Sequence, residues 1–203
     1  MFFVRQRSNQ CGLHAIQNMF KSAAVSNDDM AMACDEIHKE TGDSVLNHES
    51  FGGDWSVSAV LAAIIRQGYS VERGVDTRTT RRWVTEEIPD LLLDSEFRGI
   101  IIHQPISRHF TCLRPETVDG ERLLYYVDSQ SQGPIRISPR LAMRRCLATA
   151  YSWEPFIIKG PEMKYVSPTN IPSPMRRVSK RVRRPPEDFM KSWYALSTTK
   201  KTE

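Results

Sequence analysis

The sequence predicts an α+β domain, in which a helical N-terminal half packs on an antiparallel sheet. Up to about residue 94, apolar residues recur at the three- and four-residue spacing of amphipathic helices. From Gly99 to Lys159 they form short runs instead, and an Asp119-Gly120 turn signal separates two of these runs. Helices that precede a run of antiparallel strands are typical of this fold class.

Three helices are expected in the N-terminal part of the chain. The ranges with helical spacing are residues 10–21, 26–39 and 57–67. Each range has a suitable capping residue at its start: Ser8 or Asn9, Ser26 and Ser56. Gly68 is expected to end the third helix. Residues 41–54 contain several Gly and Asn and predict a loop.

Strands are expected from residue 69 onward, with two more helices among them. The runs that predict strands cover residues 69–73, 99–103, 109–114, 122–128 and 154–159. A helix is expected over 79–94, with a break or kink at Pro89. Another is expected from Ser138 to about Ala150, because Ser caps helices and Pro139 suits a first turn.

The composition is that of a globular protein without membrane spans. Of 203 residues, 40% are hydrophobic and 26% are charged, so one domain can bury a substantial core. No apolar run approaches the ~18 residues of a membrane span, and the first residues do not resemble a secretory signal. We therefore expect an intracellular monomer with no membrane partner.

Charge and proline content change at about residue 160. Residues 161–203 carry ten Lys and Arg against four Asp and Glu, whereas residues 1–160 carry 18 against 20. We predict a domain over 1–160 and a Pro-rich, disordered tail over 161–203, which has too little apolar surface to fold. The basic segment 176–184 has two interpretations: a nuclear localisation or nucleic-acid patch, and a solvated charge run. The expected location is therefore the cytoplasm, or the nucleus under the first interpretation.

The cysteine pattern indicates free thiols. The four cysteines are Cys11, Cys34, Cys112 and Cys146, and no two form a Cys-x-x-Cys pair. A zinc or redox motif is therefore unsupported, and we expect no metal or cofactor. Most free cysteines are small buried hydrophobic residues, so a nucleophile must be identified from its neighbours.

Cys11 is the candidate nucleophile, because it lies at the start of the first expected helix. The partial positive charge there stabilises an anion, and the thiolate is the form that attacks a carbonyl. Gln6, five residues earlier, has an amide that can stabilise an oxyanion together with the Cys11 N–H. By spacing alone, a buried structural Cys in an ordinary helix is an equally weighted interpretation.

His109 is the best candidate base among five histidines. It opens one strand of the hairpin that turns at Asp119-Gly120, and Asp128 ends the other strand. The strand register should bring the two side chains together, so that Asp128 orients the imidazole and stabilises its protonated form. The alternatives are a structural His and a common strand-end carboxylate.

Several blocks of sequence, taken in order, resemble Josephin domains, and especially the small proteins that contain little else. The resemblance covers about residues 3–160. The blocks are Gln6 to Phe20 with its Gln-x-x-x-x-Cys-x-Leu-His-Ala run, Gly53 to Tyr69, Arg108 to Arg114 and Tyr125 to Ser129. One departure is Gly12, where relatives often have Ala. Another is the short segment before Trp55, where some relatives have a longer helical arm.

This resemblance implies a papain-like cysteine protease fold and a deubiquitinating activity. Cys11 matches the family nucleophile, His109 the base, Asp128 the orienting residue and Gln6 the oxyanion-hole glutamine. The implied partners are ubiquitin and ubiquitinated proteins, cleaved at the isopeptide bond of the ubiquitin C-terminal glycine. Two alternatives remain at this point: a papain-like peptidase acting on another Gly-Gly protein, and a ubiquitin-binding module without turnover.

Overall fold

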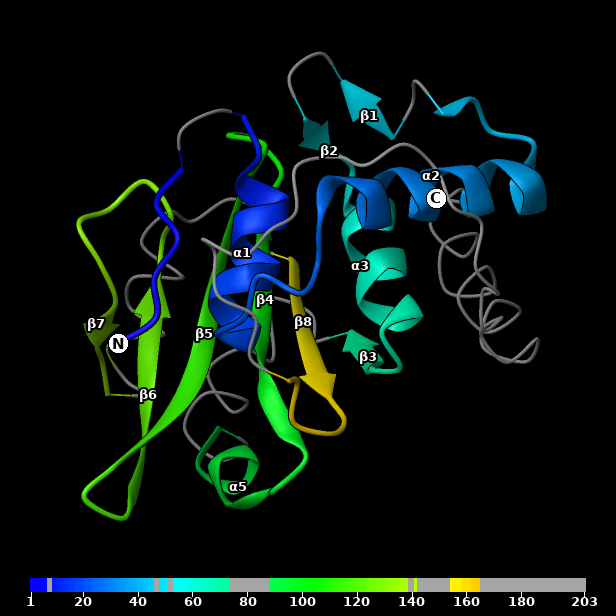
Figure 1. Cartoon of the computed structure of the whole chain (residues 1–203). Coiled ribbons are helices and arrows are strands. Elements are labelled where there is room, and N and C mark those ends of the chain that lie inside the picture. The colour runs from blue at the N-terminus through cyan, green and yellow to red at the C-terminus, as the bar shows by residue number, and fades with distance from the viewer. Residues whose placement is uncertain are drawn as a thin grey trace, which may run out of the picture.

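The α+β prediction is confirmed by the computed structural model of the chain (Figure 1). The structure describes residues 1–6, 9–45, 48–50, 53–73, 88–138, 141 and 154–164. The helices are α1 (Cys11–Phe20), α2 (Asn27–Thr41), α3 (Val57–Arg66) and α5 (Ile88–Leu93). The strands are β1 (Glu49–Ser50), β2 (Asp54–Trp55), β3 (Ser70–Arg73), β4 (Phe97–Gln104), β5 (His109–Val118), β6 (Glu121–Val127), β7 (Ile135–Arg136) and β8 (Glu154–Lys159).

Six strands form one antiparallel sheet in the order β3-β8-β4-β5-β6-β7. The hairpin β5–β6 turns at Asp119 and Gly120, which have φ values of 52° and 81°. The last strand, β8, lies between β3 and β4, so it joins the earlier and later parts of the sheet (Figure 1). A separate short hairpin pairs β1 with β2.

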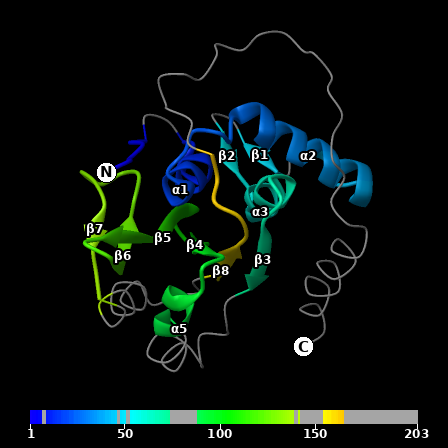
Figure 2. The same ribbon diagram turned by 60° about the horizontal axis from the view of Figure 1, so that its bottom comes forward.

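Helices cover both faces of the sheet, α1 to α3 on one face and α5 on the other (Figure 2). Alternate residues of a strand point to opposite faces. Ile101 of β4 accordingly packs in the cluster with α1 to α3, whereas Ile100 and Ile102 pack with α5. This two-sided burial explains why β4 is a continuous apolar run rather than an alternating one.

Two of the predicted helix caps are present. The Ser26 side chain accepts the Asp29 N–H, and the Asp29 carboxylate accepts the Ser26 N–H in return. The Ser56 side chain accepts the Ala59 N–H at the start of α3. The predicted Asn9 cap of α1 is wrong, because α1 begins at Cys11 and its cap residue is Gln10, whose side chain makes no capping hydrogen bond. Ser8, the other candidate, lies outside the described residues.

Some other predicted elements differ from the structure, and some lie outside the described residues. Within the predicted loop 41–54, β1 and β2 form a hairpin, and β7 was not predicted. Pro89 occupies the first turn of α5, where a missing N–H removes no helical hydrogen bond. Most of the predicted helices 79–94 and 138–150, and residues 165–203 of the predicted tail, lie outside the described residues. In the part that the structure describes, no helix has the length and apolar character needed to cross a membrane.

Candidate active site

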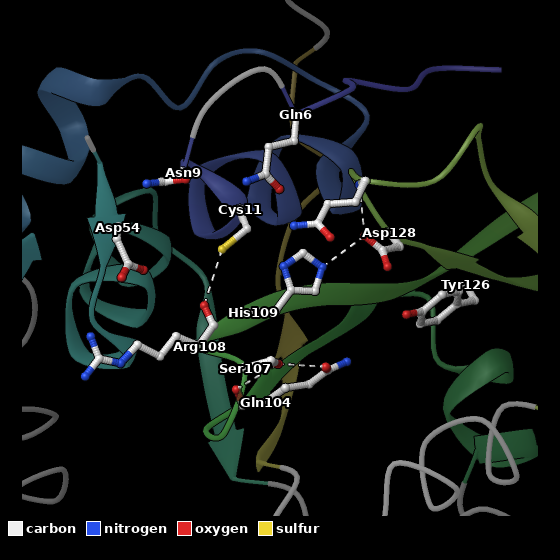
Figure 3. A pocket seen from close by; sticks show the side chains of 11 residues that line it. Gln6, Asn9, Cys11, Asp54, Gln104, Ser107, Arg108, His109, Tyr126 and Asp128 are labelled. Carbon is white, nitrogen blue, oxygen red and sulfur yellow. Dashed lines mark hydrogen bonds and ion pairs between the residues drawn. The ribbon is translucent and has the colours of Figure 1, made fainter. Parts of the chain in front are cut away.

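A cavity of about 610 Å³ opens at the N-terminal end of α1, beside the β4–β5 hairpin and the end of β6 (Figure 3). We call it the α1 cavity. Its lining consists of Gln6, Asn9, Cys11, Asp54, Gln104, Ser107, Arg108, His109, Tyr126, Asp128 and Gln130. All four candidate site residues from the sequence, including the widely separated Gln6 and Asp128, therefore line one cavity.

Cys11 is the first residue of α1, and only 5% of it is exposed. Its Sγ lies 3.6 Å from the backbone carbonyl oxygen of Arg108, across the cavity from the helix. Arg108 has a φ of 50°, a left-handed conformation at the end of the β4–β5 turn. The N–H groups of the first turn of α1 receive no capping bond from the Gln10 side chain. The sulfur therefore lies where the helix end favours negative charge.

The other described cysteines have the environment of inert core residues. Burial raises the pKa of Cys34 to about 11, and Glu49 and Asp35 contribute to this rise. Burial also raises the pKa of Cys112, to about 12. Both remain protonated thiols at neutral pH, so neither is a nucleophile. Cys146 lies outside the described residues.

His109 and Asp128 form the hydrogen bond that the hairpin pattern predicts. The Nε2 of His109 lies 2.9 Å from Oδ1 of Asp128 (Figure 3). The register differs slightly from direct opposition. Cys112 pairs with Val127, so continuing this antiparallel register places Asp128 opposite Thr111. His109 lies two residues before Thr111 on the same strand, so it is a diagonal neighbour of Asp128. Diagonal pairs on one face of a sheet remain within reach of long side chains.

The imidazole of His109 lies between Asp128 and Cys11 (Figure 3). Burial alone lowers the pKa of His109, but hydrogen bonds to Asp128 and Cys11, together with their charges, raise it to about 9. Burial likewise raises the pKa of Asp128, whereas hydrogen bonds from His109 and from the Gln130 N–H bring it below its usual value. The arrangement therefore favours an ionised Asp128 and a protonated His109 at neutral pH.

The remaining histidines make hydrogen bonds away from the α1 cavity. Their partners are Gln17 for His14, the Asp43 carbonyl for His38, Ser56 for His48 and Glu154 for His103. None of them lines the cavity. Geometry thus selects His109 from the five.

Gln6 reaches the cavity from the segment that precedes α1. Its N–H donates to the Ser129 carbonyl at 2.8 Å, and its Oε1 accepts from the Ser129 hydroxyl at 3.1 Å. The amide nitrogen of Gln6 lies on the side of Cys11 (Figure 3). This orientation presents N–H donors beside the sulfur, as oxyanion stabilisation requires.

The N-terminal arm, residues 1–6, is fixed by two buried side chains. Asn18 of α1 accepts the Val4 N–H at 2.7 Å and donates to the Val4 carbonyl at 3.0 Å. Arg114 of β5 is fully buried and donates to the Phe2 carbonyl at 2.8 Å. The arm therefore lies against α1 and the sheet, and its last residue, Gln6, is held beside the α1 cavity.

Sequence reasoning missed two contributions to this site. The carbonyl of Arg108 has no side-chain signature, although its residue lies directly before His109. Ser129 follows Asp128 in a block that supports the family resemblance, but its contact with Gln6 spans 123 positions of the sequence. Asp54, which also lines the cavity, belongs to the Gly53 to Tyr69 block.

The chemistry of the site is that of ionisable side chains. Among the residues that the structure describes, no group of three or more His, Cys, Asp or Glu could hold a metal ion. A thiol and an imidazole that line one cavity, with the imidazole hydrogen-bonded to a carboxylate and an amide donor nearby, can perform nucleophilic acyl transfer. Comparisons with known proteins add no relative, since no protein-family model and no curated protein matches the sequence.

Proposed function

We propose that this chain is a cysteine isopeptidase of the Josephin type, with a papain-like fold, that releases ubiquitin from lysine side chains. One observation carries the proposal. His109 is hydrogen-bonded to Asp128, and its imidazole lies between Asp128 and Cys11 at the wall of the cavity into which Gln6 projects (Figure 3). A nucleophile, a base and an orienting group in contact are the signature of covalent acyl transfer.

In the first half of the proposed reaction, the Cys11 thiolate attacks the carbonyl of the terminal glycine. A C–S bond forms and the π electrons of the carbonyl move to its oxygen. The Gln6 amide and the Cys11 N–H stabilise this oxyanion. As the tetrahedral intermediate collapses, the C–N bond breaks and the His109 imidazolium gives its proton to the leaving lysine amine.

In the second half, neutral His109 takes a proton from water, which attacks the thioester. The second tetrahedral intermediate expels the Cys11 thiolate and leaves the free ubiquitin carboxyl group, whose proton passes to solvent. Asp128 orients the imidazole throughout and stabilises its protonated form. The cycle returns the thiolate and imidazolium with which it began, so atoms and protons balance without a cofactor.

The low exposure of Cys11 supports a substrate that has small residues at the cleavage site. Only 5% of this residue is exposed, at the wall of a cavity that also holds Arg108 and His109. A chain that ends in Gly-Gly has no side chains beside its final carbonyl, so it can pass closer to such a thiol than other chains. Ubiquitin ends in this way, and the sequence blocks that resemble Josephin domains favour it over other Gly-Gly substrates.

The decisive experiment uses ubiquitin that carries an electrophile at its C-terminus. We expect a covalent adduct with the wild type and with Cys34→Ala, but none with Cys11→Ala. Cys34→Ala is the matched control, because it removes another buried thiol without touching the α1 cavity. Adducts with Cys11→Ala would reject Cys11 as the nucleophile. If wild type reacts only with another Gly-Gly probe, the substrate class is wrong, and if it binds ubiquitin without reacting, the protein is a binding module.

A further inference from the structure

We propose that Ser129 is a positioning residue for the oxyanion donor, and that its hydroxyl orients the Gln6 amide toward the reacting carbonyl. This inference rests on the proposed function. Ser129 does not line the α1 cavity, so it acts through Gln6 rather than on the substrate. It is 2% exposed, which keeps water from competing for its hydrogen bonds.

The contact between Ser129 and Gln6 has two parts with different consequences. The backbone bond, from the Gln6 N–H to the Ser129 carbonyl at 2.8 Å, fixes where the arm ends. The side-chain bond, from the Ser129 hydroxyl to Gln6 Oε1 at 3.1 Å, fixes which end of the amide faces Cys11. Replacing Ser129 by Ala removes only the second bond, so it tests orientation while the arm stays attached.

Orientation decides whether a glutamine helps or hinders this reaction. Its amide has a donor end and an acceptor end of almost equal size. With Oε1 held by Ser129, the nitrogen faces Cys11 and can donate to an oxyanion (Figure 3). After a half turn of the amide, Oε1 would face the developing negative charge and repel it. A buried hydroxyl donor is therefore a device for holding the productive orientation.

The turn after β6 sets both sides of the reaction centre. Asp128 holds the imidazole through Oδ1, and the next residue, Ser129, holds the oxyanion donor. The turn itself is fixed by hydrogen bonds to Asp128 from the Gln130 N–H at 2.9 Å and from the Ser131 N–H at 2.9 Å. Consecutive residues on a rigid turn thus place the proton donor and the oxyanion donor at a constant separation.

The test compares two ubiquitin substrates on Ser129→Ala. One is a ubiquitin C-terminal amide with a fluorescent leaving group, whose hydrolysis passes through an oxyanion. The other is a ubiquitin C-terminal propargylamide, whose inner alkyne carbon takes the thiolate while its terminal carbon takes a proton, which forms a vinyl thioether without any oxyanion. We expect kcat for the amide to fall about tenfold, less than the ~10²–10³ for loss of an oxyanion donor itself. KM and the rate of propargylamide labelling should remain within about twofold.

Ser131→Ala is the matched control. The Ser131 hydroxyl donates to the Asp128 carbonyl at 2.7 Å in the same turn but does not touch Gln6. We expect its kcat to stay near that of wild type. Ser129→Thr, which keeps the hydroxyl, should recover most of the lost rate. The double variant Gln6→Ala with Ser129→Ala should be no slower than Gln6→Ala alone, because both substitutions remove the same function, which is the oriented oxyanion donor.

The outcomes separate this inference from the proposed function. If wild type reacts with neither ubiquitin substrate, the proposed function fails and Ser129 has no donor to position. If wild type reacts with both and Ser129→Ala hydrolyses the amide at the wild-type rate, the positioning role is rejected. Equal losses with the amide and the propargylamide would show a general disturbance of the site, and would also reject it.

Discussion

Gly12 and Val60 pack so closely that α1 and α3 meet at the residue directly after Cys11, the candidate nucleophile. A Cβ on Gly12 would lie 2.7 Å from Cγ2 of Val60 and 3.5 Å from Cδ2 of Phe110. Val60 is fully buried, and Phe110 follows the candidate base His109. Glycine at position 12 therefore lets α1 approach both α3 and β5, the strand that carries His109.

The first prediction concerns Gly12→Ala. Overpacking against Val60 should cost about 1–3 kcal/mol, partly offset by about 1 kcal/mol from the better helix propensity of Ala. We expect a net loss of unfolding free energy, measured by urea denaturation. In a Val60→Ala background the new methyl group has room, so the same substitution should become neutral or stabilising.

Gly133→Ala is the control for this pair, because a Cβ at Gly133 meets nothing within 4 Å and its backbone requires no positive φ. It should change stability by less than about 0.5 kcal/mol. If Gly12→Ala is equally destabilising in the wild-type and the Val60→Ala backgrounds, the contact with Val60 is not the cause.

The second prediction is that Asp128→Asn moves the alkaline limit of activity to lower pH. In the proposed reaction His109 must be protonated to give a proton to the leaving amine, and its pKa is raised to about 9. Activity should therefore persist above neutral pH and fall as pH rises through about 9. Asn keeps a hydrogen-bond acceptor but lacks the charge, while burial, which lowers the pKa of His109, remains. The alkaline limb of kcat/KM should then move down by about one pH unit or more.

The chain contains a matched control for the charge effect. Glu154 pairs with His103 through Oε2 and Nδ1 at 3.1 Å, outside the α1 cavity. Glu154→Gln removes a similar carboxylate from a histidine and should leave the pH profile unchanged. An Asp128→Asn profile that coincides with that of wild type would contradict the assignment of His109 as the proton donor.

The sequence predicts those contacts of the site that form within one helix or one hairpin. The approach of His109 to Asp128 could be predicted because both belong to one hairpin with a recognisable turn. The exact register, in which His109 and Asp128 are diagonal neighbours, could not be predicted, because it depends on where β5 and β6 pair rather than on where their sequence patterns end. Cys11 could be placed at a helix start from apolar spacing alone.

Contacts between distant segments left no such signal. Ser129 meets Gln6 across 123 positions of the sequence, and Asn18 and Arg114 hold the same N-terminal arm against the fold. Strands of two residues, such as β7, are too short to show an alternating pattern. The α1 cap was predicted wrongly because Asn is a favourable cap residue. With Asn9 as the cap the helix would begin at residue 10, whereas it begins at Cys11 with Gln10 as the cap. This places Cys11 in the first position of the helix.

The third prediction concerns the reactivity of the cysteines in the folded protein. Treatment with iodoacetamide at pH 7 should alkylate Cys11 and leave Cys34 and Cys112 unmodified, because burial raises the pKa of these two to about 11 and 12. A Cys146→Ala background keeps the fourth thiol from contributing. Peptide mass mapping before and after unfolding gives the measurement. Alkylation of Cys112 as fast as Cys11 in the native state would show that its burial does not protect it.

The fourth prediction concerns Asn18, which connects the stability of the N-terminal arm to the activity. Asn18 is 1% exposed, and its side chain makes both hydrogen bonds to Val4. Asn18→Ala should cost about 1–3 kcal/mol of unfolding free energy, because two backbone groups lose buried partners. Loosening the arm should also displace Gln6, so kcat for ubiquitin amide hydrolysis should fall about tenfold while alkylation of Cys11 by iodoacetamide continues.

The neighbouring Gln17 distinguishes displacement of Gln6 from simple destabilisation. Gln17 is 3% exposed and donates to the Val25 carbonyl at 2.8 Å, on the loop that follows α1 rather than on the arm. Gln17→Ala should lose a comparable amount of stability and keep kcat near the wild-type value. If both variants lose activity in proportion to their loss of stability, the arm has no special part in placing Gln6. If only Asn18→Ala loses kcat, the placement of Gln6 depends on the hydrogen bonds that Asn18 makes to Val4, two residues earlier in the arm.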